Sequence, residues 1–179
     1  IYVYQRASIQ YSLIVVLSRM LNIDIFWVHL CLVGTLWSLF IPIFAFKTTK
    51  ALGANNRIGL LAAVLMANAP ILVGWSFVEV PNSLGFIFFA ATIYFSAKLL
   101  TSNAKRKYCL LAFATSIVSL LTHSMTGFVS FAILWLALGL MTYDSNKNRN
   151  KKTALFTLLL GLAASALLLP ATAISLQLI

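Results

Sequence analysis

The chain has 179 residues, of which 61% are hydrophobic and only 9% are charged, and its formal net charge is +10. Soluble domains carry about 25% charged residues, so this composition, with a mean hydropathy of +0.97, excludes a soluble globular fold and indicates that lipid solvates part of the surface. The excess of positive charge is typical of short loops between membrane spans, and we expect no nucleic-acid partner.

An amphipathic helix in the plane of the membrane interface is predicted over Ser8–Leu21, within an outer-face segment formed by residues 1–24. One helical face carries the apolar side chains Ile9, Leu13, Val16, Leu17 and Met20. Another face carries Ser8, Ser12 and Arg19, and this separation of polar from apolar residues is typical of an interfacial helix. A tilted or half-inserted span is the alternative interpretation of this segment.

About six membrane spans are predicted in residues 25–179, because a spanning helix needs about 20 mostly apolar residues. The stretches that qualify are Ile25–Phe46, Ile58–Phe77, Ser83–Leu100, Tyr108–Thr122, Gly127–Tyr143 and Thr153–Ile179. We expect kinks rather than breaks at Pro42, Pro70 and Pro170, because neighbouring helices can satisfy the freed carbonyl groups. The predicted fold class is all-α: a polytopic transmembrane helical bundle with an outer-face amphipathic helix.

Basic residues predict the orientation of these spans. All but two of the 13 lysines and arginines lie in or beside three loops, and two predicted spans separate each loop from the next. These residues are Lys47, Lys50, Arg57, Lys98, Lys105, Arg106, Lys107, Lys147, Arg149, Lys151 and Lys152. The positive-inside rule places all three loops in the cytoplasm. The sequence therefore predicts an integral, multi-pass protein of a prokaryotic plasma membrane.

The remaining polar groups gather at the opposite, extracytoplasmic ends of the predicted spans. They are Arg6, Arg19, Asp24, His29, Glu79 and His123. Charges at membrane depth are costly and usually functional, but the cost is much smaller near span ends. For the two arginines and the aspartate, interface anchoring or helix capping is favoured over a role in function. For His29, a hydrogen-bonded position within its helix is favoured.

Glu79 and His123 are the strongest candidates for a functional site on this side. Glu79 lies in the turn before Pro81, where it is either a working residue or a solvated loop charge. A functional role is favoured for His123, because it ends an unusually short predicted span.

The motifs of soluble enzymes give no further candidates. The sequence has no phosphate-binding glycine loop, no zinc-protease motif and no nucleophile elbow. The only carboxylate pair that the outer face can offer is Asp24 with Glu79. Cys31 and Cys109 lie inside apolar runs and are interpreted as buried structural thiols.

The order of these features resembles the membrane core of GT-C type glycosyltransferases, over residues 5–143. The features that carry the resemblance are the helix end Arg19–Asp24, the cytoplasmic turn Lys50–Arg57, the stretch Asn68-Ala69-Pro70, the outer turn Glu79-Val80-Pro81 and the span end Leu120–His123. Proteins of this kind are polytopic enzymes that take a sugar from a polyprenyl-phosphate carrier on the outer face of the membrane. Within them, the chain is most similar to the mannosyltransferase-like group.

The resemblance implies a catalytic acid in the first outer loop. The chain begins with Ile1 rather than Met and ends inside an apolar run, so we expect it to be an internal fragment of a longer protein and its catalytic acid to precede residue 1. Glu79 corresponds to a second outer acid that would help to bind a divalent cation, Mg²⁺ or Mn²⁺. His123 corresponds to a histidine often found at the outer end of a span.

The carrier itself would be held by charged and apolar groups. Arg6 or Arg19 would pair with its phosphate, and the helix face around Phe86, Phe88 and Phe89 would hold its polyprenyl tail. The implied partners are membrane lipid and a polyprenyl-phosphate-linked sugar, and the sequence carries no signal of oligomeric state.

Two other functions stay open from the sequence. A transporter or flippase for a lipid-linked or small solute would carry polar residues near the bilayer midplane and internal repeats, and the sequence shows neither. A non-catalytic scaffold or a polymer ligase is the second alternative, although a ligase would need a long outer loop.

Overall fold

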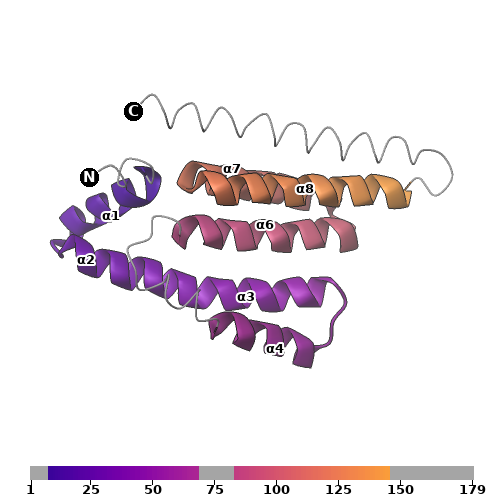
Figure 1. Ribbon diagram of the computed structural model, residues 1–179, viewed down its shortest axis with the longest axis horizontal. Helices are drawn as coiled ribbons and strands as arrows, with labels where there is room; N and C mark the ends of the chain where they lie inside the picture. Colours follow the sequence, from indigo (N-terminus) through magenta and orange to yellow (C-terminus); the bar gives the residue numbers. More distant parts are fainter. Residues whose placement is uncertain (1–7, 69–82, 146–179) are drawn as a thin grey trace.

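The computed structural model describes residues 8–68 and 83–145, and within these ranges every regular element is a helix (Figure 1). The elements are α1 (Ser8–Leu21), α2 (Ile25–Val28), the π-helix η2 (His29–Gly34), α3 (Thr35–Ala51), α4 (Asn56–Ala67), α6 (Ser83–Thr101), α7 (Lys105–Thr122) and α8 (Ser124–Ser145). The predicted all-α class is confirmed. The predicted span Thr153–Ile179, the second half of the span Ile58–Phe77, Pro70 and Pro170 lie outside the described residues.

The long helices form a stack in which α4 packs antiparallel on α3, α3 packs parallel to α6, and α6, α7 and α8 contact one another (Figure 1). Aromatic pairs join α3 to α6, with the Trp37 and Phe86 rings 5.6 Å apart and the Phe44 and Tyr94 rings 6.0 Å apart. The core between α6, α7 and α8 is made of small and medium side chains, among them Leu99, Ala112, Leu134 and Ala137.

The predicted cytoplasmic turn between α3 and α4 is built by local backbone chemistry. Gly53 adopts φ +92°, and the Ala54 N–H donates to the Thr49 carbonyl oxygen at 3.0 Å, which closes a Schellman motif at the end of α3. The Asn55 side chain then caps α4 by accepting the Ile58 N–H at 2.9 Å. The sequence therefore specifies this reversal within a few residues, and α4 leads back along α3.

A second local corner separates α1 from α2. Asn22 adopts φ +53°, a conformation that asparagine tolerates better than most residues, and the Ile23 N–H donates to the Ser18 carbonyl oxygen at 3.1 Å. The Asp24 carboxylate then accepts the Phe26 N–H at 2.8 Å and caps α2. The capping role expected for Asp24 is thus observed.

The first long helix differs from the prediction in length and in geometry. It extends to Ala51 rather than Phe46, and its residues His29–Gly34 form a π-helix. Pro42 lies inside α3, so it does not break the helix, as expected. The π-helical turn depends on packing around the helix, which residue spacing does not reveal.

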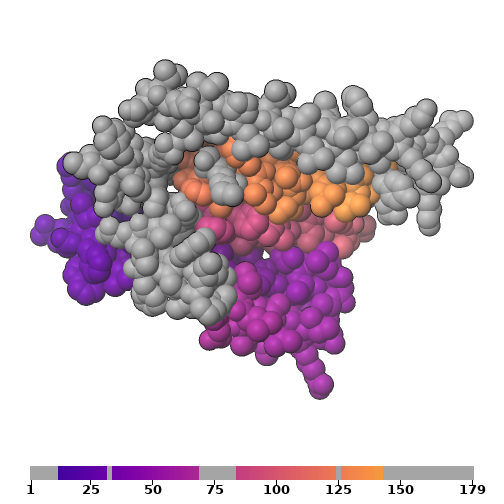
Figure 2. Space-filling model, in the orientation of Figure 1, coloured from indigo at the N-terminus to yellow at the C-terminus, as the bar shows by residue number. Residues whose placement is uncertain are grey.

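Two described helical stretches, Ile25–Ala51 and Leu84–Thr101, are long and apolar enough to cross a membrane. The shorter stretches Ser12–Leu21, Asn56–Ala67 and Thr126–Thr142 are also apolar helices. Many large apolar side chains of the described helices are exposed, including Leu60 (61%) and Leu65 (62%) on α4, whose outer face is visible in Figure 2. Contiguous apolar surface of this kind is typical of a face covered by lipid.

The amphipathic helix α1 contacts the rest of the chain through Ile14, which lies outside its predicted apolar face, and through Leu17, which belongs to that face. Ile14 is fully buried and packs with Val28 and Leu17, whereas Val16 and Met20 are exposed. An exposed apolar face is the arrangement expected of a helix that rests in the membrane interface.

The backbones of α7 and α8 approach each other closely at Gly127. A Cβ atom built on Gly127 would lie 2.2 Å from Leu120 Cα and 2.6 Å from Leu120 N, so no side chain fits at this position. Small residues let helix backbones approach closely and drive association in lipid, where the hydrophobic effect between helices is absent.

We predict that Gly127→Ala destabilises the protein by about 1–3 kcal/mol, because the added methyl group must push the α7 backbone away. The measurement is the thermal unfolding midpoint of the detergent-solubilised protein. Val129→Ala is the matched control on the same helix, because Val129 is 44% exposed. Equal midpoints for the two variants would show that the close crossing does not hold the helices together.

Candidate functional site

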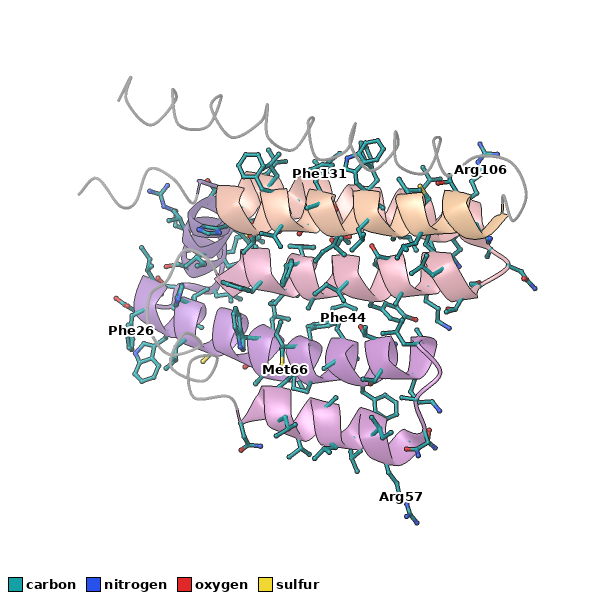
Figure 3. The ribbon with its side chains drawn as sticks, turned by 45° about the vertical axis from the view of Figure 1, so that its right-hand side comes forward. Phe26, Phe44, Arg57, Met66, Arg106 and Phe131 are labelled. Atoms are coloured by element: carbon teal, nitrogen blue, oxygen red, sulfur yellow. The ribbon has the colours of Figure 1, made fainter. Side chains whose placement is uncertain are left out.

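The predicted site residues Arg19 and His123 lie at one end of the bundle, together with the start of α2 and the start of α6 (Figure 1). The α3–α4 and α6–α7 turns lie at the other end, and in Figure 3 Arg57 and Arg106 stand at that end, away from Phe26. Arg6 and Glu79 lie outside the described residues. The described part of the site is therefore the junction of α7 with α8, while Arg19 lies at the end of α1 that leads into α2 (Figure 1).

His123 forms the whole connection between α7 and α8. Its backbone is extended (φ −155°, ψ 114°), and its N–H donates to the Ser119 carbonyl oxygen at 2.8 Å, which ends α7. Its carbonyl oxygen accepts the Gly127 N–H at 3.0 Å, and its Nδ1 accepts the Thr126 N–H at 3.3 Å. His123 is thus the N-cap of α8, and the gap between the predicted spans Tyr108–Thr122 and Gly127–Tyr143 is reduced to a single residue because this residue caps both helices.

These contacts define the state of the imidazole. Because Nδ1 accepts a hydrogen bond, the ring is neutral and carries its proton on Nε2, which is then a donor. Burial lowers the pKa of His123 from its ordinary value of 6.5, because desolvation disfavours the imidazolium. The junction therefore presents a neutral, oriented N–H donor.

The start of α6 packs against this junction without a side chain between them. A Cβ atom on Gly85 would lie 2.9 Å from both His123 Cβ and Thr126 Oγ1, so only glycine fits here. The Ser119 hydroxyl is shared between the Gly85 carbonyl oxygen and Thr126 Oγ1, both 3.2 Å away. Three helices thus fix the position of His123.

A line of buried hydroxyl groups continues from the junction into the bundle. Its members on the three helices are Thr92, Ser116, Ser119, Thr122, Thr126 and Ser130. Most donate to a carbonyl oxygen one turn earlier, such as Ser130 Oγ to Thr126 O at 2.7 Å, and Thr92 Oγ1 lies 2.9 Å from Thr115 Oγ1. The sequence analysis missed this line and Gly85, although Ser and Thr recur at spacings of three or four residues from Ser116 to Ser130.

Arg19 lies in the last turn of α1, and its side chain is exposed. A cation at this position interacts favourably with the negative end of the helix dipole. The α1 helix contacts α2 and α7, so its end is held beside the bundle. The Asp24 carboxylate caps the N-terminus of α2, as described above.

The described residues provide no group of three or more His, Cys, Asp or Glu side chains that could hold a metal ion. Asp24 is the only described carboxylate at this end, and it is engaged as a helix cap. The described part of the site therefore does not fit a divalent cation by itself.

An apolar groove of about 300 Å³ runs between α3, α6 and α7. Its aromatic lining consists of Phe40, Phe44, Phe88 and Phe95. Of the three phenylalanines predicted to hold a lipid tail, Phe88 lines this groove, whereas Phe86 packs edge-on against both Trp37 and Phe89.

A family model described as dolichyl-phosphate-mannose-protein mannosyltransferase matches residues 28–170 of the chain. No curated protein and no solved structure matches the chain. The matched residues include the whole bundle from the last residue of α2 to the end of α8.

The neutral state of His123 predicts a pH dependence of stability. The folded protein keeps this ring neutral below pH 6.5, whereas the unfolded chain takes up a proton there, so the unfolding free energy falls as the pH drops below 6.5 towards the lowered pKa. His123→Asn is the matched variant, because an asparagine side chain also caps a helix but does not titrate. The unfolding midpoint of the native protein should therefore fall relative to that of His123→Asn between pH 8 and about pH 5; a constant difference would contradict the assigned protonation state.

Proposed function

The chain belongs to the dolichyl-phosphate-mannose-protein mannosyltransferase family, and on this basis we propose that it forms part of a membrane glycosyltransferase that takes its sugar from a polyprenyl-phosphate carrier at the extracytoplasmic face. The family match over residues 28–170 is the observation that supports a transferase over a transporter or a scaffold. The geometry of the described residues supports the finer parts of the proposal.

The separation of charge between the two ends of the bundle supports the proposed sidedness. Lys50 and Arg57 flank the α3–α4 turn, and Lys105 and Arg106 begin α7 at the same end. Under the positive-inside rule this end faces the cytoplasm. The end that carries Arg19 and His123 then faces the extracytoplasmic side, where a lipid-linked donor would present its phosphate.

Arg19 and His123 are suited to bind that phosphate. An exposed guanidinium can form two charge-assisted hydrogen bonds to phosphate oxygens. The neutral imidazole of His123 can add a donor through Nε2, because Nδ1 is held by the Thr126 N–H. We propose the same role for Arg6, from the sequence.

The transfer would break the bond between the anomeric carbon and the phosphate oxygen, which leaves with the electron pair on the polyprenyl phosphate. The acceptor hydroxyl oxygen forms the new bond, and its proton passes to a carboxylate. We propose that this carboxylate precedes Ile1 and that Glu79 is a ligand for a divalent cation. The described residues carry neither group, so they act by binding and orienting the donor.

The apolar groove between α3 and α6 would hold the first isoprene units of the carrier. Its walls are almost entirely aromatic and aliphatic. The flexible hydrocarbon of a polyprenyl chain can adapt to such a surface without hydrogen bonds.

The first functional prediction concerns His123. In the complete protein, His123→Ala should lower kcat/KM for the polyprenyl-phosphate donor by about 10–100-fold, because a hydrogen bond to a charged phosphate is lost. The measurement is sugar transfer from the lipid-linked donor in detergent. His123→Asn should retain the cap and the fold but lose part of this activity, because its amide is shorter than the imidazole.

Two further variants sharpen that test. Arg19→Gln should raise the KM for the donor, whereas Arg57→Gln, at the opposite end, should leave kcat and KM unchanged. Normal transfer by His123→Ala with an unchanged unfolding midpoint would remove this residue from the site.

The second functional prediction concerns sidedness. In a background without Cys31 and Cys109, Asn103→Cys in the α6–α7 turn should react with a membrane-impermeant maleimide only from the cytoplasm. Asn22→Cys, in the α1–α2 corner, should react only from outside. Labelling of both positions from one side of sealed vesicles would contradict the proposed orientation.

A further inference from the structure

A second groove lies at the basic end of the bundle, on the opposite side of the proposed membrane from the sugar site. It has a volume of about 270 Å³, and its apolar walls come from three helices: Leu99 on α6, Cys109 and Leu110 on α7, and Leu138 and Met141 on α8. Its remaining lining residues are Lys105 and Arg106, both exposed, and Figure 3 shows Arg106 projecting outward at this end. A hydrophobic floor with two cations beside it is complementary to an amphipathic anion.

The start of α7 is electrostatically unfavourable without an anion. Its first three residues are Lys105, Arg106 and Lys107, its first turn has no acidic residue, and Ala104 at the N-cap provides no side-chain hydrogen bond. Positive side chains at the positive end of a helix dipole repel it, and the first backbone N–H groups lack helical partners. A phosphate group beside Lys105 and Arg106 would reduce this charge repulsion and would accept hydrogen bonds from the N–H groups that lack helical partners.

The apolar walls of the groove favour a lipid over a free anion as its ligand. Leu110 is 62% exposed beside the two cations, and the groove continues along Leu138 towards the middle of α8. Water would solvate this surface poorly, whereas an acyl chain from the surrounding bilayer can cover it. The anionic lipids of the cytoplasmic leaflet attract juxtamembrane lysines and arginines in the same layer.

We propose that this groove binds one anionic phospholipid of the cytoplasmic leaflet. The headgroup phosphate lies against Lys105 and Arg106 at the start of α7, and one acyl chain lies along Leu110 and Leu138. The site rests on the membrane placement of the bundle and is independent of the sugar-transfer reaction.

The test is a lipid titration of the full chain in detergent, with bound lipid counted by native mass spectrometry. Phosphatidylglycerol should bind as a single tightly held molecule, with an affinity at least tenfold higher than that of phosphatidylcholine. About tenfold is the change in affinity expected from one or two cations beside the headgroup. The double variant Lys105→Gln/Arg106→Gln should lose this preference. The matched control Lys50→Gln/Arg57→Gln removes the same charge at the same end of the bundle and should keep it.

A further pair of variants tests the apolar part of the groove. Cys109→Phe fills the groove without a change of charge and should abolish the tightly bound lipid. If Cys109→Phe lowers the unfolding midpoint, Leu110→Gln replaces it, because Leu110 is largely exposed and contributes little to packing.

Three results would overturn the proposal. Equal loss of bound lipid from the Lys50→Gln/Arg57→Gln control would show that general surface charge, and not this groove, attracts the lipid. Retention of the lipid when the apolar wall is changed would exclude the groove as its location. Displacement of the lipid by millimolar inorganic phosphate would identify a simple anion site.

Discussion

The close contact of α6, α7 and α8 at one end of the bundle is the constraint on which the described structure depends. Gly85 and Gly127 allow the three backbones to meet, and the buried hydroxyl groups between them bond to carbonyl oxygens of the helices. In lipid, such contacts replace the hydrophobic effect as the source of helix association. A larger residue at either glycine would separate the helices at the point where His123 turns the chain.

This constraint also gives His123 its structural role. The residue joins two helices by itself, so its backbone and Nδ1 are used by the fold. The fold thereby orients the ring and keeps it neutral, so that Nε2 would be the donor available to the proposed phosphate ligand. Arg19 reaches the same end of the bundle through α1, which is held by its contacts with α2 and α7.

The helices and their turns could be predicted from the sequence because the signals are local. Gly53 and Asn55 specify the α3–α4 turn, and Asp24 caps α2. The role of Gly85 could not be predicted, because it depends on residues about 40 positions away in the chain. The extension of α7 to Lys105 was missed because basic residues ended the apolar run, although they continue the helix.

The π-helix His29–Gly34 has a consequence for how the protein can change during evolution. A π-helical turn is the geometry that a helix adopts when one residue is inserted into it. Loss of one residue here would restore a regular α-helix, because the wider π-helical turn holds the extra residue while the helix on either side keeps its phase. The α1 helix would then stay on its side of the bundle, so an in-frame deletion of one codon within His29–Gly34 should be tolerated better than one within the regular helix α3.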